Sequence, residues 1–106
     1  MRRSRFAAAV VMAALAGCGG GAGKPRAHAV AIRGFQFAPA ELTVAVGDTV
    51  VWTNEDVVPH TATASGAWDT GSIAARQTGR VVIATKGTHR YVCAFHPGMQ
   101  ARVEAR

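Results

Sequence analysis

Apolar and polar residues alternate in short runs along most of this chain, and turn-forming residues separate the runs. Alternation with a period of two is typical of strands that bury one face, and no stretch has the helical period of about 3.6 residues. The runs occupy residues 29–32, 35–37, 42–46, 49–53, 60–64, 80–84, 89–94 and 100–104, with an irregular segment expected at 65–75. Seven or eight such strands predict an all-β fold, an antiparallel Greek-key β-sandwich or small barrel.

The apolar positions within these runs predict one hydrophobic core. Trp52 is the largest of them and is expected to anchor it. The predicted core residues are Ile32, Phe37, Leu42, Val44, Val50, Trp52, Val81, Ile83, Tyr91 and Val103. No internal repeat is visible, so we expect a single domain at residues 28–106.

The first 17 residues have the pattern of a secretory signal peptide. Arg2, Arg3 and Arg5 supply its positive region, and residues 6–16 are an unbroken apolar run. Because this run is shorter than the roughly 20 apolar residues of a membrane-spanning helix, it predicts export rather than a permanent span.

The signal leads into Leu15-Ala16-Gly17-Cys18, which resembles the bacterial lipobox. Cleavage before Cys18 and lipidation of its thiol would anchor the exported protein to the membrane, in the periplasm or on the extracellular face. An ordinary signal peptide with an incidental cysteine is the alternative. Residues 18–27 are rich in glycine and predict a flexible tether to the domain.

The formal net charge is +6, and loss of the three signal arginines leaves +3. The chain has no basic helix and no interleaving of aromatic and basic residues, so no nucleic-acid partner is expected. A mildly basic surface favours an acidic protein partner, mainly through the rate of association.

The chain contains two cysteines, Cys18 and Cys93. Exported proteins often pair cysteines in disulfides, but lipidation of Cys18 would leave Cys93 without a partner. A lone thiol is reactive in an oxidising compartment unless something occupies it, and a metal ion would do so.

Three potential metal ligands follow one another at three-residue intervals, namely Cys93, His96 and Met99. They lie just after a predicted strand and around Pro97-Gly98, where a turn can direct all three side chains to one point. His60, on an earlier predicted strand, is the fourth candidate. Two imidazoles, a thiolate and a weakly bound thioether form the ligand set that suits copper in electron transfer.

Other metal centres fit these ligands less well. Structural zinc usually takes four firm ligands, with more cysteines and no thioether. Non-haem iron takes a carboxylate beside histidines, a binuclear copper centre needs a second cysteine in the loop, and haem attachment needs a Cys-x-x-Cys-His motif. The remaining histidines, His28 and His89, have no comparable neighbours, and we expect them to be solvated.

Each of the four ligand candidates also has an ordinary structural explanation. Cys93 fits an inert buried thiol, Met99 a gap-filler in the core, His96 a surface residue beside a turn, and His60 the end of a strand. Their joint occurrence around one turn of an all-β chain favours the copper site over four separate explanations.

Together these motifs resemble the cupredoxins, and most closely their amicyanin- and plastocyanin-like group. The resemblance covers about residues 35–103 and rests on Phe37-x-Pro39, Val46-Gly47-Asp48-Thr49-Val50, Trp52-x-Asn54, Pro59-His60, Trp68-Asp69-Thr70-Gly71 and Tyr91-x-Cys93-x-x-His96-Pro97-x-Met99. The short loop from cysteine to methionine is more like that of amicyanin than that of plastocyanin. With the lipobox, the whole chain is similar to membrane-anchored members such as halocyanins.

The resemblance implies a cupredoxin-like fold that holds one type 1 copper ion, which cycles between Cu(I) and Cu(II). It makes His60, Cys93 and His96 the strong equatorial ligands and Met99 the axial ligand. The protein is then a carrier of single electrons between redox proteins, and not an enzyme. The alternative is a copper carrier or storage protein that hands the metal to another protein.

Thr61 departs from the family pattern, because many relatives have asparagine directly after the first histidine ligand. We expect its backbone N–H to donate to the Cys93 sulfur, and its hydroxyl to replace part of the tie between the two ligand strands. Asn54 and Pro97 are also expected to support the ligands.

The family implies transient docking through a small apolar patch around the exposed histidine. Here the patch is predicted at Pro59, Pro97 and Gly98, with Val57 or Val58. The lipid would keep the carrier near its partners at the membrane, and the chain is expected to act as a monomer.

Overall fold

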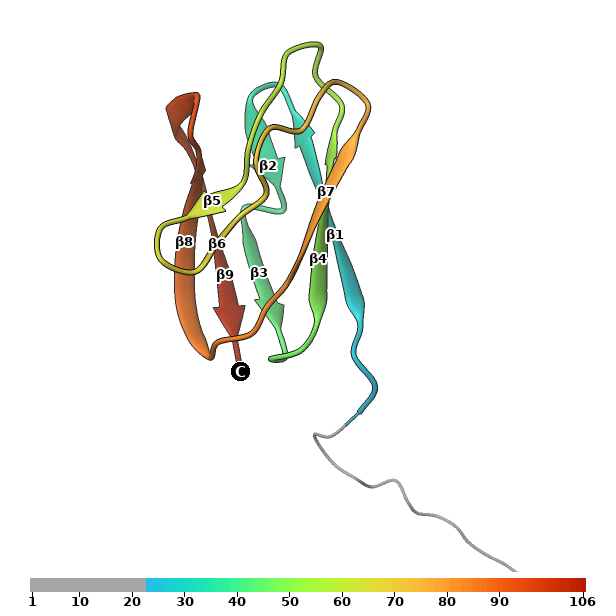
Figure 1. Ribbon diagram of the computed structural model, residues 1–106, viewed down its shortest axis with the longest axis vertical. Coiled ribbons are helices and arrows are strands. Elements are labelled where there is room, and N and C mark those ends of the chain that lie inside the picture. Colours follow the sequence, from blue (N-terminus) through green and yellow to red (C-terminus); the bar gives the residue numbers. More distant parts are fainter. Residues whose placement is uncertain (1–22) are drawn as a thin grey trace, which may run out of the picture.

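The computed structural model describes residues 23–106, which form two β-sheets packed face to face (Figure 1). The predicted signal peptide (residues 1–17), the lipidation site Cys18 and the first part of the tether lie outside the described residues. Within the described part, no helix has the length and apolar character needed to cross a membrane. The strands are β1 (Ala27–Arg33), β2 (Gln36–Ala38), β3 (Glu41–Val44), β4 (Thr49–Asn54), β5 (Thr63–Ala64), β6 (Trp68–Asp69), β7 (Thr78–Val82), β8 (Gly87–Cys93) and β9 (His96–Ala105).

The two sheets confirm the predicted all-β sandwich, but each sheet is mixed rather than antiparallel. The strand order is β2-β1-β4-β7 in one sheet and β3-β9-β8-β5-β6 in the other. β1 pairs with β4 in parallel, and β3 pairs with β9 in parallel. Figure 1 shows the reason: β2 and β3 point the same way, one in each sheet, so the chain changes sheets between them and β4 then runs alongside β1.

Nine strands occur in the described part, more than the seven or eight expected. The predicted strand at 60–64 is reduced to the two residues of β5, and His60 makes only an isolated bridge with Ile73. The segment 65–75, expected to be irregular, contains the two-residue strand β6. The chain around His60 is therefore held by individual hydrogen bonds rather than by a long strand ladder.

Alternate residues of the long strands point inward, as the period of two predicts. β4 buries Val50, Trp52 and Asn54, and β8 buries Tyr91 and Cys93. The alternation thus places a polar amide and a thiol in the buried layer, at the ends of β4 and β8.

Leu42 and Val81 are only partly buried, which corrects their assignment to the core. They lie on β3 and β7, which are edge strands with a neighbour on one side only. The other eight predicted core residues are buried. The core also contains Met99, which fits its explanation as a gap-filler. Six further core residues were not singled out by the sequence pattern, namely Val30, Ala62, Ala64, Ile73, Ala101 and Ala105.

Trp52 and Tyr91 link the two sheets inside the core. The indole Nε1–H of Trp52 donates to the Tyr91 hydroxyl oxygen over 3.1 Å, and the ring centroids are 5.5 Å apart in an edge-to-face arrangement. Phe37 packs against the same tyrosine ring at 4.7 Å. Burial raises the pKa of Tyr91 to about 12, although the Trp52 hydrogen bond acts in the opposite direction. The phenol therefore stays neutral near neutral pH.

His28 is not solvated but is bound to Asp48, at the end of the sandwich where the described chain begins (Figure 1). Its Nε2 lies 2.8 Å from Asp48 Oδ2, and its side chain is 18% exposed. The backbone amides of Arg26 and Ala45 donate to the same carboxylate. The parallel register, which pairs His28 with Val50, brings the ring next to Asp48, and this register could not be inferred from the sequence pattern.

His89 is likewise half-buried rather than solvated. Its Nε2 donates to the carbonyl oxygen of Thr85 over 2.7 Å, and its ring packs against Trp68 at 5.4 Å. The reason is the strand alternation, which places His89 on the same inward face of β8 as Tyr91.

Replacing Tyr91 with phenylalanine should lower the free energy of unfolding by about 1–3 kcal/mol, because the Trp52 indole N–H would stay buried without an acceptor. Urea denaturation followed by circular dichroism measures the change. Thr88→Val removes a hydroxyl from an exposed residue and should change stability by less than about 0.5 kcal/mol. Equal stability of wild type and Tyr91→Phe would contradict the contribution of this hydrogen bond.

Replacing Asp48 with asparagine should flatten the loss of stability in acid. The pKa of Asp48 is lowered from 3.8 to about 2, first by the hydrogen bond from His28 and then by the Ala45 and Arg26 amides, while burial opposes them. Such a carboxylate stabilises the fold above about pH 4, and this contribution is lost as the pH falls toward 2. Melting temperatures at a series of pH values measure the slope, and an unchanged slope in a folded Asp48→Asn protein would contradict this contribution.

Candidate metal site

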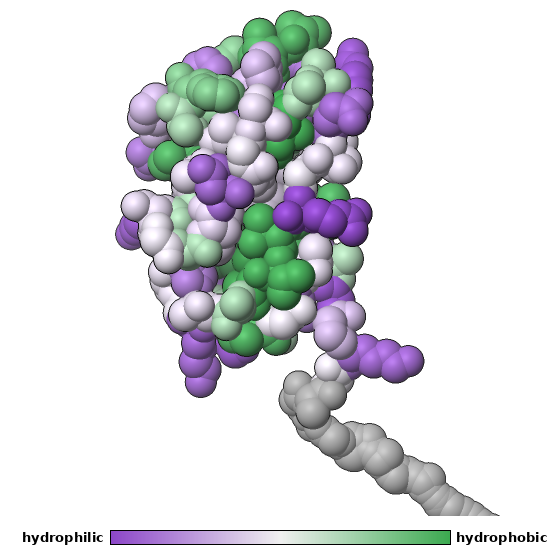
Figure 2. Space-filling model, in the orientation of Figure 1, coloured by the Kyte–Doolittle hydropathy of each residue, from purple (hydrophilic) through white to green (hydrophobic). Residues whose placement is uncertain are grey.

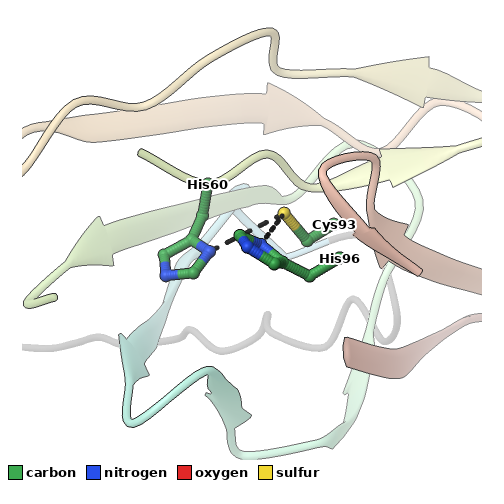
Figure 3. A group of neighbouring side chains, drawn as sticks. All are labelled: His60, Cys93 and His96. Atoms are coloured by element: carbon green, nitrogen blue, oxygen red, sulfur yellow. Dashed lines mark hydrogen bonds between the residues drawn. The ribbon is translucent and has the colours of Figure 1, made fainter. Parts of the chain in front are cut away.

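Three of the four predicted ligands meet at one end of the sandwich (Figure 3). The ligand atoms of His60, Cys93 and His96 all lie within 4.8 Å of one another. The Cys93 sulfur is 3.7 Å from His60 Nδ1 and 3.6 Å from His96 Nδ1. His60 and Cys93 are buried, whereas His96 is half-buried. Cys93 is the free cysteine of the described part.

These separations fit a shared metal ion. Typical metal–nitrogen and metal–sulfur bonds are about 2.0 and 2.3 Å long, so a nitrogen and a sulfur that subtend about 120° at one ion lie about 3.7 Å apart. The two observed separations match this value. The donor set is therefore close to a three-coordinate arrangement of two imidazoles and one thiolate.

The hairpin between β8 and β9 places two of the ligands. Cys93 ends β8 and His96 begins β9, and the two residues pair directly across the hairpin. The register shifts between Val92 and Cys93, which marks a bulge at this point. Bulges re-aim side chains next to functional sites, and here the hairpin brings the thiol and the second imidazole together over two intervening residues.

Thr61 joins the segment of His60 to this hairpin. Its backbone N–H donates to the Cys93 sulfur over 3.3 Å, and its hydroxyl oxygen accepts the Ala94 N–H over 2.8 Å. Both contacts expected of Thr61 are thus present. An N–H directed at sulfur stabilises the thiolate form that a metal requires, and the hydroxyl holds the two segments in register.

Asp56 orients His60, a role that the sequence analysis missed. Asp56 Oδ2 lies 2.9 Å from His60 Nε2. A carboxylate accepts hydrogen bonds but does not donate them, so Nε2 carries the proton and the Nδ1 lone pair is left to face Cys93. The only signal in the sequence is an acidic residue four positions before a histidine, which is too common to be diagnostic.

Asp56 remains charged in this setting. Burial alone would raise the pKa of Asp56, but hydrogen bonds from the amides of Phe35 and Gly34 and from the His60 ring outweigh it and lower the pKa below its ordinary value. The negative charge stays close to the His60 imidazole and favours a cation in the site.

Asn54 shapes the loop that leads to His60, in keeping with the support predicted for it. Its side-chain N–H groups donate to the carbonyls of Val58 and Ile73, and its Oδ1 accepts the Asp56 amide. The amide is completely buried, so each of these hydrogen bonds replaces one to water.

Met99 and Pro97, the remaining predicted residues of the loop, differ in burial. Met99 is buried in β9, three residues after His96, among the core residues. Pro97 is exposed, and its carbonyl accepts a hydrogen bond from the Gln100 side chain over 3.2 Å. Burial of Met99 is compatible with an axial role, which stays a prediction.

Phe35 is a second residue that the sequence analysis missed at the site, since it was assigned only to a strand. Its ring packs edge-on against both imidazoles, with centroid distances of 5.0 Å to His60 and 4.9 Å to His96. The two imidazole centroids are 5.3 Å apart. An exposed aromatic residue thus closes one side of the cluster.

Comparison with known proteins supports a cupredoxin-like domain. A family model described as the cupredoxin-like domain matches residues 5–103. The Cu(I) form of an amicyanin variant with a methionine replaced by alanine is 28% identical, with a TM-score of 0.71, and the match covers 76% of this chain and 82% of that chain. The reduced state of a variant with a proline replaced by phenylalanine is 30% identical, with a TM-score of 0.69 and the same coverage. The curated proteins give no match.

Replacing Asp56 with alanine should weaken Cu(II) binding by about 10–100-fold, the usual effect of losing a residue that orients a metal-binding histidine. Competition with a chelator of known affinity measures the change. Asp48→Ala is the matched control, because Asp48 also accepts hydrogen bonds from two backbone amides and pairs with a histidine, but at the opposite end of the sandwich. Unchanged affinity in a folded Asp56→Ala protein would contradict this role.

Proposed function

Because this chain belongs to the cupredoxin-like domain family, we propose that it is a type 1 blue copper protein that carries single electrons between redox proteins outside the cytoplasmic membrane. The observation that carries the proposal is the meeting of His60, Cys93 and His96 at separations that suit one metal ion. The similar amicyanin structures include Cu(I) and oxidised states, which supports copper as the metal.

One copper ion, when bound, supplies the one-electron change between Cu(II) and Cu(I). The protein's part is to hold the ligands still, because small changes in ligand geometry keep electron transfer fast. Asp56 and Thr61 do this from two directions: Asp56 fixes the imidazole of His60, and Thr61 fixes the sulfur of Cys93. We propose Met99 as the weak axial ligand and Pro97 as a support of the loop around His96.

Electrons would enter and leave through His96, because it is the half-buried ligand whereas His60 and Cys93 are buried. The residues of the predicted docking patch, Pro59, Pro97 and Gly98, are exposed, and Val57 is 82% exposed. Figure 2 shows hydrophobic side chains gathered at the upper end of the molecule, where the loop before His60 lies.

Two phenylalanines extend this apolar end beyond the prediction. Phe35 is 48% exposed and Phe95 is 52% exposed. With Val57 they make up three of the five exposed large hydrophobic residues of the described part. A small apolar surface of this kind suits brief docking of a monomer to redox partners.

An N-terminal anchor would leave the docking end free. The described chain begins at the end of the sandwich opposite the candidate metal site (Figure 1). Lipid on Cys18 and a flexible glycine-rich tether would therefore hold the protein at the membrane and leave the His96 end accessible to partners. We propose this arrangement in the periplasm or on the extracellular face.

Replacing Cys93 with serine should abolish an intense visible absorption band of the Cu(II)-loaded protein, because the band arises from charge transfer between the thiolate and copper. Visible and EPR spectra of wild type and variant test this. Cys18→Ser is the matched control: it should keep the blue colour and move the protein from the membrane to the soluble fraction. A pale wild-type protein would contradict the electron carrier and leave the copper carrier as the better function. A blue Cys93→Ser protein would contradict the assigned copper site.

A further inference from the structure

Phe35 occupies a backbone position that disfavours its side chain. The hairpin from β1 to β2 has only two loop residues, Gly34 and Phe35, and both have a φ of 59°. Tight turns with two positive φ angles normally have glycine, asparagine or aspartate at these positions. A bulky residue with positive φ is strained, and such strain is concentrated at functional sites.

The strained turn is held by the same carboxylate that orients a metal ligand. Asp56 Oδ1 accepts the Gly34 N–H over 2.7 Å, and Asp56 Oδ2 accepts the Phe35 N–H over 2.9 Å. Asp56 Oδ2 also lies 2.9 Å from His60 Nε2. One side chain therefore couples the backbone of the turn to the imidazole of His60.

The Phe35 ring is placed where it restricts both histidines. Edge-to-face contacts at 4.9 and 5.0 Å lie within the range in which aromatic pairs attract. The ring is 48% exposed, so burial of its own surface does not by itself explain its position. Phe95 provides a contrast: it precedes His96 directly and is 52% exposed, yet no aromatic contact joins it to either imidazole in the described part.

We infer that Phe35 is a positioning residue for His60 and His96, held in a strained turn by Asp56 so that its ring fixes the two imidazole planes and keeps water from the metal site. The inference rests on the proposed function in one respect, that these histidines bind copper. The orientation of the rings, however, belongs to the protein chain and exists without the metal.

Two consequences follow from this placement. Without the Phe35 ring, the half-buried His96 would rotate more freely, and the site would change more on reduction. Water would also reach the site, and a more polar environment favours the more highly charged Cu(II) state. Phe35 therefore raises the reduction potential and slows the loss of copper.

The test replaces Phe35 with glycine, which removes the ring and also relieves the positive φ, so the fold and the Asp56 hydrogen bonds are retained. Phe95→Ala is the control, since it removes an equally exposed ring close to the site. In the metal-free protein, NMR relaxation of the His60 and His96 rings should show greater mobility in Phe35→Gly than in wild type or in Phe95→Ala. In the copper-loaded protein, Phe35→Gly should have a lower reduction potential and lose copper to a chelator about tenfold faster.

Equal ring mobility in Phe35→Gly and wild type, together with equal potentials, would overturn the inference. The proposed function and the role of Phe35 can be disproved independently. A wild-type protein without the blue spectrum would remove the proposed function, whereas the NMR comparison of the metal-free proteins would still decide whether Phe35 positions the imidazoles. Phe35→Leu, which keeps apolar bulk without an aromatic edge, should have an intermediate copper-loss rate.

Discussion

The hydrogen bonds of Thr61 to the hairpin between β8 and β9 are the interaction on which the rest of the site depends. They join Thr61 to residues 32 and 33 positions further along the chain, over 3.3 Å to the Cys93 sulfur and 2.8 Å from the Ala94 amide. Because His60 precedes Thr61 directly, the same contacts bring the first imidazole beside the thiol. The Thr61 backbone provides the first of these contacts and its hydroxyl the second.

The two ends of the sandwich serve different purposes, and the interactions at each differ accordingly. At the metal end, Asn54 and Asp56 are polar residues that shape a loop without regular structure, and Phe35 is strained and half exposed. Between the ends, Trp52 and Tyr91 lock the sheets together. Buried polar side chains, an irregular loop and a strained aromatic residue are thus concentrated at the candidate site, as expected where function competes with stability.

The metal-binding explanation of Cys93 and Met99 is compatible with their ordinary structural explanations. Cys93 is indeed a buried thiol, and Met99 is indeed part of the core, as the ordinary explanations held. Neither fact competes with metal binding, because a rigid, buried environment is what limits ligand movement during electron transfer. The hydrophobic interior therefore helps to hold the candidate ligands in place.

The sequence by itself determined the all-β class, most of the core and the short spacing of the ligand loop, because strand alternation and hairpin loops act over two to four residues. Tertiary structure alone decided what depends on register between distant segments. The parallel pairing of β1 and β4 placed His28 on Asp48, and the edge position of β3 and β7 left Leu42 and Val81 partly exposed. Asp56 and Phe35, 21 positions apart, became parts of the site only because the β1–β2 turn folds over the loop before His60. No local pattern encodes such contacts.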